Sequence, residues 1–167
     1  DAKFLFKEIG YNFIPPEMGA VFGLEQLKKI EKFSKIRKSN FLELHSFFSK
    51  YENFFILPEA SSGLITNWLA FPLTIKETGP FTRIELVTYL EKNNIQTRPL
   101  FTGNALLHEA FRHIKHRIAK NGCPVTEKIT KRAFVIGCHH GIGQKELNYI
   151  KEVFEKFLEP ISKPIAV

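Results

Sequence analysis

The stretch from Ala133 to Leu158, AFVIGCHHGIGQKELNYIKEVFEKFL, contains the two kinds of element that recur through most of the chain. Its first six residues, Ala133 to Cys138, are almost all apolar, which is typical of a buried β-strand. From about Gln144 to Leu158 the apolar side chains return at helical spacing, namely Leu147, Ile150, Val153, Phe154 and Phe157. A buried strand followed by an amphipathic helix predicts a helix that packs on a sheet.

The same alternation extends toward the N-terminus. Further strands are expected over Phe54–Leu57, Trp68–Ile75 and Ile95–Leu100, and further helices over Ile84–Asn93 and residues 125–132. Thr82 and Glu85 have the spacing of a capping box, which marks the start of the first of these helices. Pro72 lies inside the second strand and therefore indicates an edge strand or a bulge.

A long helix is expected before the first strand, from about residue 17 to residue 50. Pro15-Pro16 followed by Glu17 suits a helical first turn. Apolar residues then recur every three positions, at Val21, Leu24, Leu27, Ile30, Phe33 and Ile36. Because a straight helix drifts away from a strict three-residue repeat, we expect a break near Ser34 or at Ser39-Asn40.

These elements predict a single two-layer α/β (α+β) domain over residues 1–167, with helices on a small mixed or antiparallel sheet and a frayed tail at 160–167. The composition, 44% hydrophobic and 25% charged, is that of a globular protein. No apolar run approaches the roughly 18 residues of a membrane span, so no membrane partner is expected. Two cysteines do not make a disulfide scaffold, and we expect free thiols in a cytoplasmic protein.

The charge is basic and unevenly distributed. The formal net charge is +7, which favours anionic partners. Residues 112–132 contain one acidic side chain, Glu127, and seven basic ones: Arg112, Lys115, Arg117, Lys120, Lys128, Lys131 and Arg132. This stretch is either a solvated basic loop or a surface that contacts phosphates.

No complete active site can be recognised from residue types alone. The histidine and cysteine spacings match no structural zinc pattern, and no phosphate-binding glycine loop is present, so no metal site is expected. Three segments are nevertheless unusual for a protein core: Gly10-Tyr11-Asn12, Thr97 to Asn104, and Phe134 to Gly143. Each combines polar or aromatic side chains with glycine near the expected end of an element.

These three segments, in this order, resemble the C-terminal part of the DegT/DnrJ/EryC1/StrS family of pyridoxal-phosphate-dependent nucleotide-sugar enzymes. The matching residues are Gly10 to Phe13, Glu17 to Ala20 and Gly23 to Leu27, with Gly19 where the family usually has Gln. Residues 95–104, IQTRPLFTGN, and 134–142, FVIGCHHGI, are similar to the branch of sugar 3-dehydratases, with His140 where Pro is usual.

The resemblance implies that this chain is the C-terminal small domain of a fold-type-I enzyme of deoxysugar biosynthesis. Residues 1–16 would then be a segment between domains that contacts the cofactor. The cofactor pocket and the catalytic Lys or His belong to a large N-terminal domain in this family. We therefore expect no catalytic residue here, no activity of the chain alone, and no cofactor bound by it. The chain would be an excised domain or a truncated reading frame.

The resemblance also implies roles for particular residues. Gly10, Tyr11 and Asn12 would contact the phosphate of pyridoxal or pyridoxamine phosphate across a homodimer interface. Arg98, Phe101 and Asn104 would border the pocket for a nucleotide-diphosphate sugar. In the complete enzyme the chemistry would be removal of the sugar 3-hydroxyl, with the cofactor as the electron sink.

Other interpretations remain open. The same fold also suits the small domain of a nucleotide-sugar aminotransferase, which has Lys instead of His at the cofactor aldehyde. A third hypothesis is a non-catalytic module that binds through its basic stretch or oligomerises, although nucleic acid is the less favoured partner because the aromatic residues follow core spacings. Branch members that act on CDP sugars use an iron–sulfur cluster and a reductase, so such a partner is implied for a CDP-sugar substrate.

Overall fold

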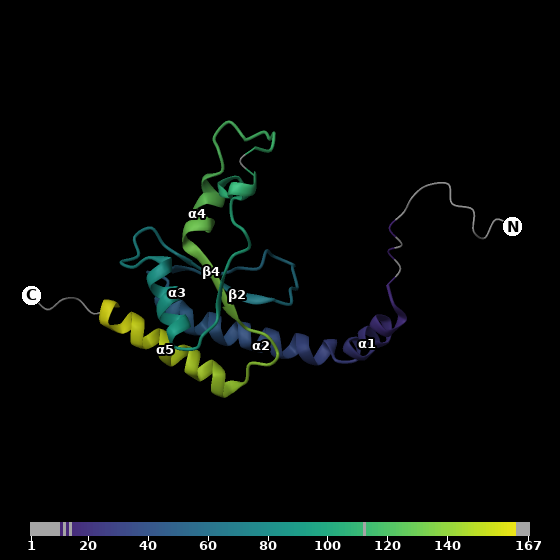
Figure 1. Ribbon diagram of the computed structural model, residues 1–167. Helices are drawn as coiled ribbons and strands as arrows, with labels where there is room; N and C mark the ends of the chain where they lie inside the picture. The colour runs from purple at the N-terminus through teal and green to yellow at the C-terminus, as the bar shows by residue number, and fades with distance from the viewer. Residues whose placement is uncertain (1–10, 12, 14, 112, 163–167) are drawn as a thin grey trace, which may run out of the picture. The chain divides into compact units, whose positions relative to one another are not determined.

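The computed structural model describes residues 11, 13, 15–111 and 113–162, which form two compact units divided between Lys32 and Phe33 (Figure 1). The helices are α1 (Glu17–Leu27), α2 (Ile30–Phe48), α3 (Arg83–Lys92), α4 (Pro124–Arg132) and α5 (Gln144–Ser162), and short 3-10 turns lie at Ser49–Tyr51, Ala105–Leu107 and Glu109–Phe111. The strands are β1 (Phe55–Ile56), β2 (Ala70–Ile75), β3 (Thr97–Pro99) and β4 (Ala133–Gly137). The expected α/β class is confirmed.

The four strands form one antiparallel sheet in the order β1-β2-β4-β3. The expectation of an edge strand or bulge at Pro72 is wrong, because β2 lies inside the sheet and Pro72 pairs in register with Val135. Proline is accommodated because β1 pairs only with Thr74 and Ile75 of β2. In the described part of the chain, no strand lies opposite Pro72 on the β1 side. The lack of a backbone N–H on this proline therefore leaves no hydrogen bond between strands unmade there.

One face of the sheet is covered by α2, α3 and α5, and the hydrophobic core lies between them. The strand side chains on this face are fully buried: Phe71, Leu73, Ile75, Phe134 and Ile136. Phe48 of α2 is central, because its ring contacts Phe55, Phe71 and Phe154 at centroid distances of 4.8 to 5.7 Å. The inward positions expected for the last helix are confirmed, with Leu147, Val153 and Phe154 buried.

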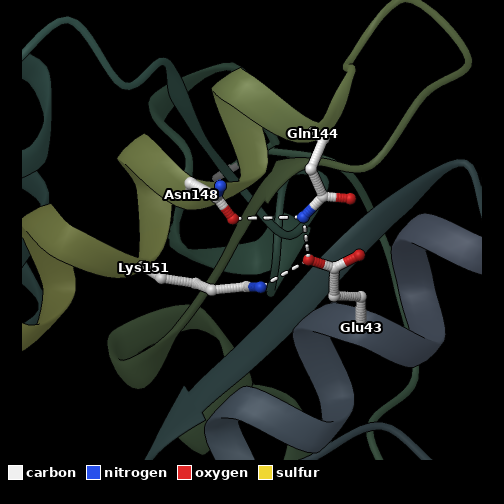
Figure 2. Close-up of polar contacts among 4 residues, drawn as sticks. All are labelled: Glu43, Gln144, Asn148 and Lys151. Carbon is white, nitrogen blue, oxygen red and sulfur yellow. Dashed lines mark hydrogen bonds and ion pairs between the residues drawn. The ribbon is translucent and has the colours of Figure 1, made fainter.

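Polar contacts also connect α2 with α5 (Figure 2). The Glu43 carboxylate accepts hydrogen bonds from the Lys151 ammonium and, at 2.6 Å, from the Gln144 amide, which also donates to Asn148 at 3.1 Å. These hydrogen bonds, first that from Lys151, lower the pKa of Glu43 below its ordinary value. The network therefore fixes the register of two helices that cross the same face of the sheet.

The capping box expected at the start of α3 is also confirmed. The Thr82 hydroxyl accepts from the backbone N–H of Glu85, and the Glu85 carboxylate accepts from the backbone N–H of Thr82 at 2.6 Å. Two backbone donors at the helix start are thereby satisfied. This end of α3 is joined to α4, since Arg83 donates to the backbone oxygen of Lys131 at 3.2 Å.

The long first helix is interrupted, but not where the sequence predicts. The break lies at Lys28-Lys29, between α1 and α2, while α2 continues through Ser34, Ser39 and Asn40. Ser34 and Asn40 do not end the helix, because their side chains form hydrogen bonds with distant parts of the chain. Ser34 accepts from Asn67 at 2.9 Å, and the Asn40 amide donates to two backbone oxygens of a later turn. The expectation of a break at Ser34 or Ser39-Asn40 is therefore wrong.

The first unit contains α1, and none of the helix's residues is buried. Its large apolar side chains are 60–83% exposed, namely Met18, Val21, Phe22, Leu24 and Leu27. At the other end of the chain, α5 continues through Pro160 to Ser162, while residues 163–167 lie outside the described part. In the described ranges no helix is both long and apolar enough to cross a membrane.

Candidate functional site

The face of the sheet opposite the core helices forms a groove. The registers place Pro72, Val135 and Arg98 in one row across β2, β4 and β3, and Ala70 next to Gly137 in the following row on the same face. These residues line a groove with a volume of about 640 Å³. Small side chains make its floor, so the hollow is a direct consequence of strand alternation.

The rim of the groove carries the larger and more polar groups. Arg98 is exposed at β3, and Phe101 follows two residues after the strand with its ring 85% exposed. Phe101 has φ +53°, a left-handed conformation that is strained for an aromatic residue. The backbone therefore holds an aromatic ring in solvent at a mostly apolar groove that Arg98 also lines. Such an arrangement suits a ligand that has both a flat apolar part and an anionic part.

Asn104, the third residue assigned to the sugar-nucleotide pocket, lies away from the groove lining. It is 8% exposed, and its side-chain oxygen accepts from the backbone N–H of Leu106 at 3.1 Å. Its own backbone N–H donates to the Thr130 hydroxyl at 2.8 Å. Gly103 permits this approach to α4, because its φ is +65° and a Cβ there would lie 2.3 Å from the Thr130 oxygen. The structure thus brings Arg98 and Phe101 together and gives Asn104 hydrogen bonds that shape their loop.

The loop after β4 contains the thiol and the two histidines noted in the sequence. Cys138 is buried, its thiol donates to the Trp68 backbone oxygen at 3.7 Å, and burial raises its pKa to about 11. A thiol in this environment is a poor nucleophile. His140 stacks on Phe33 at 3.7 Å between centroids, whereas His139 lines the groove. Within the described residues, no group of three or more His, Cys, Asp or Glu side chains could hold a metal ion.

Of the three residues assigned to the cofactor phosphate, only Tyr11 is described. Its side chain is 84% exposed and its ring lies 5.7 Å from that of Phe13. Gly10 and Asn12 lie outside the described residues. The assignment of all three to the cofactor stays a prediction.

The basic stretch divides into two parts. Lys128 pairs with Glu77 at 3.3 Å, and Arg132 donates to the Lys76 backbone oxygen at 3.1 Å, so α4 uses both side chains to contact the end of β2. Lys115, Arg117 and Lys120 are exposed in the loop before α4, and Arg112 lies outside the described residues. Two of the seven basic side chains in this stretch, those of Lys128 and Arg132, therefore have a structural use.

Comparison with known proteins identifies the family. The family model described as the DegT/DnrJ/EryC1/StrS aminotransferase family matches residues 1–155. The chain therefore belongs to the DegT/DnrJ/EryC1/StrS aminotransferase family, as its three sequence segments indicated.

Two curated relatives extend the comparison. The chain is 36% identical over 157 residues to the lipopolysaccharide biosynthesis protein RfbH of Salmonella typhimurium, covering 94% of this chain and 36% of that protein. It is 34% identical over 158 residues to dTDP-4-dehydro-2,6-dideoxy-D-glucose 3-dehydratase of Saccharopolyspora spinosa, covering 95% and 34%. The chain thus spans about a third of the length of these relatives.

Solved structures share the fold. Two structures of GDP-4-keto-6-deoxymannose-3-dehydratase, one with bound GDP-perosamine and one from E coli with bound hydrated PLP, match with TM-score 0.75 and 28% identity. Each match covers 90% of this chain and 38% of the solved chain. An aminotransferase from Psychrobacter cryohalolentis matches with TM-score 0.81 at 15% identity, which shows the fold alone.

The sequence interpretation assigned only some of the groove residues to a site. Trp68, Leu69, Gly137 and His139 line it without having been assigned to a site. Strand alternation could have found Ala70, Pro72, Val135 and Gly137, because small residues alternate there with large buried ones. In the expected strand over Trp68–Ile75, Trp68 also falls on the face of Ala70 and Pro72, whereas Leu69 had no comparable signal.

Proposed function

We propose that this chain is the C-terminal small domain of a pyridoxal- or pyridoxamine-phosphate-dependent nucleotide-sugar 3-dehydratase, and that it supplies part of the sugar-nucleotide pocket. The observation that carries the proposal is the groove bordered by Arg98 and Phe101. Support comes from the relatives at 34–36% identity, one of which is named a 3-dehydratase, and from the fold shared with a 3-dehydratase that binds GDP-perosamine.

The role of the groove residues follows from their chemistry. Arg98 offers a planar, permanently charged set of donors, which can bind a diphosphate through two oxygens at once. The floor of Ala70, Pro72, Val135 and Gly137 has few polar side-chain atoms and therefore excludes water beneath the ligand. The exposed Phe101 ring can cover a flat base or a sugar face.

The fit of this chain to the cofactor rests on Tyr11, whose exposed phenol can donate a hydrogen bond to a phosphate oxygen. Gly10 and Asn12 are proposed as its companions on sequence grounds. When bound to the complete enzyme, the cofactor supplies the electron sink that lets the sugar 3-hydroxyl leave. This chain contributes by orienting the cofactor and the nucleotide sugar, and none of its residues is assigned to proton transfer.

The complete protein is proposed to be a homodimer located in the cytoplasm. An iron–sulfur reductase is proposed as a partner only where the substrate is a CDP sugar. A nucleotide-sugar aminotransferase is the second candidate, since an aminotransferase has the same fold. The residue at the cofactor aldehyde separates the two candidates, and the reading frame that precedes the codon for Asp1 would reveal it. His there supports the dehydratase, and Lys supports the aminotransferase.

Ligand binding tests the groove directly. GDP, CDP and dTDP are titrated separately into the ¹⁵N-labelled chain, and we expect at least one to shift the amide resonances of Val135 and Gly137. Arg98→Gln should weaken that binding about tenfold or more, because it removes a charged hydrogen-bond donor. Lys92→Gln is the matched control, since Lys92 is exposed and lies outside the groove lining. Equal weakening by both variants, or shifts confined to residues 113–123, would contradict the proposal.

A further inference from the structure

His139 lies at the end of the groove with one ring nitrogen already used. Its Nδ1 accepts a hydrogen bond from the backbone N–H of Gly141 at 3.1 Å. A nitrogen that accepts from an amide carries no proton, so the neutral ring must carry its proton on Nε2. The turn after β4 therefore selects one tautomer and leaves Nε2–H as a donor.

The position of Gly137 shows where that donor lies. A Cβ built on Gly137 would be 3.7 Å from Nε2 and 3.5 Å from Cδ2 of His139, and both residues line the groove. The Nε2 edge of the ring thus lies within van der Waals contact of the space above Gly137. No described residue accepts a hydrogen bond from Nε2.

The turn that carries His139 is fixed from the core side. The Asn40 amide, only 5% exposed, donates to the backbone oxygens of His139 and Ile142, each at 3.0 Å. These two hydrogen bonds from a buried amide hold the backbone of the turn in place. The hydrogen bond from the Gly141 N–H then orients the His139 ring. An unpartnered donor is therefore positioned before any ligand arrives.

We propose that His139 is a ligand-binding residue that donates from Nε2–H to an oxygen of the nucleotide sugar. The proposal rests on the proposed function, because it takes the ligand to be the one that Arg98 binds through its diphosphate. Arg98 pairs with Val135, Gly137 is two residues further along β4, and Arg98, Gly137 and His139 all line the same groove. Two donors on one groove suit one molecule with an anionic group and a second acceptor oxygen, such as a sugar carbonyl or hydroxyl.

The chemistry of the two donors differs, and the difference identifies the ligand class. Arg98 is charged and binds a charged oxygen most strongly, whereas the Nε2–H of His139 can also donate to a neutral acceptor. His139 therefore discriminates among sugars with the same nucleotide. We expect a nucleoside diphosphate sugar to depend on His139 and the corresponding free nucleoside diphosphate to depend on it much less.

Two substitutions at the same position separate the donor from the structure of the turn. A Gln amide reaches about as far as Nε2, so His139→Gln retains a donor in the groove. An Asn amide reaches only as far as Nδ1 and Cδ2, so His139→Asn can still accept from Gly141 but carries its donor one atom short of the Nε2 position. His140→Asn is the matched control, because His140 is adjacent, stacks on Phe33 and is absent from the groove lining.

Binding is measured with GDP-mannose and GDP as probes, by NMR titration of the 167-residue chain and its variants. We expect His139→Asn to weaken GDP-mannose binding about threefold to tenfold and to change GDP binding less than twofold. His139→Gln and His140→Asn should stay within about twofold of the unsubstituted chain for both probes. Long-range ¹H–¹⁵N spectra of the imidazoles should show His139 in the Nε2–H tautomer.

The possible failures are distinguishable. If Arg98→Gln weakens binding of both probes while His139→Asn leaves GDP-mannose binding unchanged, the His139 assignment is wrong and the proposed function stands. If the unsubstituted chain binds neither probe, and neither CDP nor dTDP, at NMR concentrations, both proposals fall together. An Nδ1–H tautomer at His139 would overturn the His139 assignment whatever the affinities.

Discussion

The two faces of the sheet are made by the same strands but have opposite chemistry. In β4, Phe134 and Ile136 are buried under the helices, whereas Val135 and Gly137 line the groove. In β2 the same alternation separates Phe71 and Leu73 from Pro72. Large apolar side chains fill one face to core density, and small ones leave the other hollow. The difference indicates that stability is concentrated on one face and binding on the other.

The largest expected effect belongs to the helix-covered face. Phe134→Ala should lower the free energy of unfolding by about 3 to 5 kcal/mol, because it removes a fully buried ring and leaves a cavity. Val135→Ala, one residue along the same strand, should cost less than about 1.5 kcal/mol. Urea unfolding followed by circular dichroism measures both. Similar losses for the two variants would contradict the division between faces.

A smaller loss is expected at the contact that connects the core to the groove. Asn40→Ala removes both amide donors to the turn at His139 to Ile142, which should cost about 1 to 3 kcal/mol and speed hydrogen exchange within that turn. Asn67→Ala serves as the control, since Asn67 is exposed and donates only to Ser34. Its change should stay within about 0.5 kcal/mol. An unaltered exchange rate at Gly141 in Asn40→Ala would contradict the positioning of the turn.

The polar network between α2 and α5 should contribute less, and its contribution should depend on pH. The folded-state pKa of Glu43 is lowered, so its stabilisation is present above the unfolded pKa near 4.5 and is lost as the pH falls through the folded pKa. We expect Glu43→Gln to cost about 0.5 to 1 kcal/mol at pH 7 and less at pH 3, because protonation removes the charge of the carboxylate. Urea unfolding at both pH values measures this.

An exposed ion pair on α5 provides the comparison for Glu43. Glu152 and Lys156 are more than half exposed, so Glu152→Gln should change the free energy of unfolding by less than about 0.5 kcal/mol at either pH. If the two Glu→Gln variants change the free energy of unfolding equally, the contact of Glu43 with Lys151 and Gln144 contributes no more to stability than an exposed ion pair does.

The smallest effect on stability is expected on the open face. Arg98→Gln should leave the free energy of unfolding within about 0.5 kcal/mol, because its side chain is exposed and the strand is kept. The same variant should lose most of its affinity for the nucleotide ligand. A loss of stability comparable to that of Asn40→Ala would instead give Arg98 a structural role.

Much of the fold follows from local pattern. The capping box at Thr82 and Glu85, the apolar run of β4 and the helical spacing of α5 each predict the element that forms, because backbone capping and burial of one face act within a few residues. The prediction fails at Ser39-Asn40, where a polar pair in a helix has its partner about a hundred residues later. It also fails at Pro72, whose tolerance depends on how short the neighbouring strand is.

The candidate site was accessible from the sequence only in part. Arg98 and Phe101 stood out because Arg, Gly and Asn cluster after a strand, a common place for binding residues. The separate position of Asn104 could not be foreseen, since its hydrogen bond to Thr130 joins residues 26 positions apart. The orientation of His139 could not be foreseen either, because it depends on the hydrogen bond from the Gly141 N–H and on the space beside Gly137.

The amino-acid sequence by itself determined the order of helices and strands, the family and the residues that bury the core, because periodicity, capping and turn chemistry are local properties. Only the tertiary structure decided which strands are neighbours, which face is left open, and which of the polar residues lie in the groove. The physical reason is that a hydrogen bond or a cavity depends on the distance between groups in space, and that distance is set by the packing of the whole sheet against α2, α3 and α5.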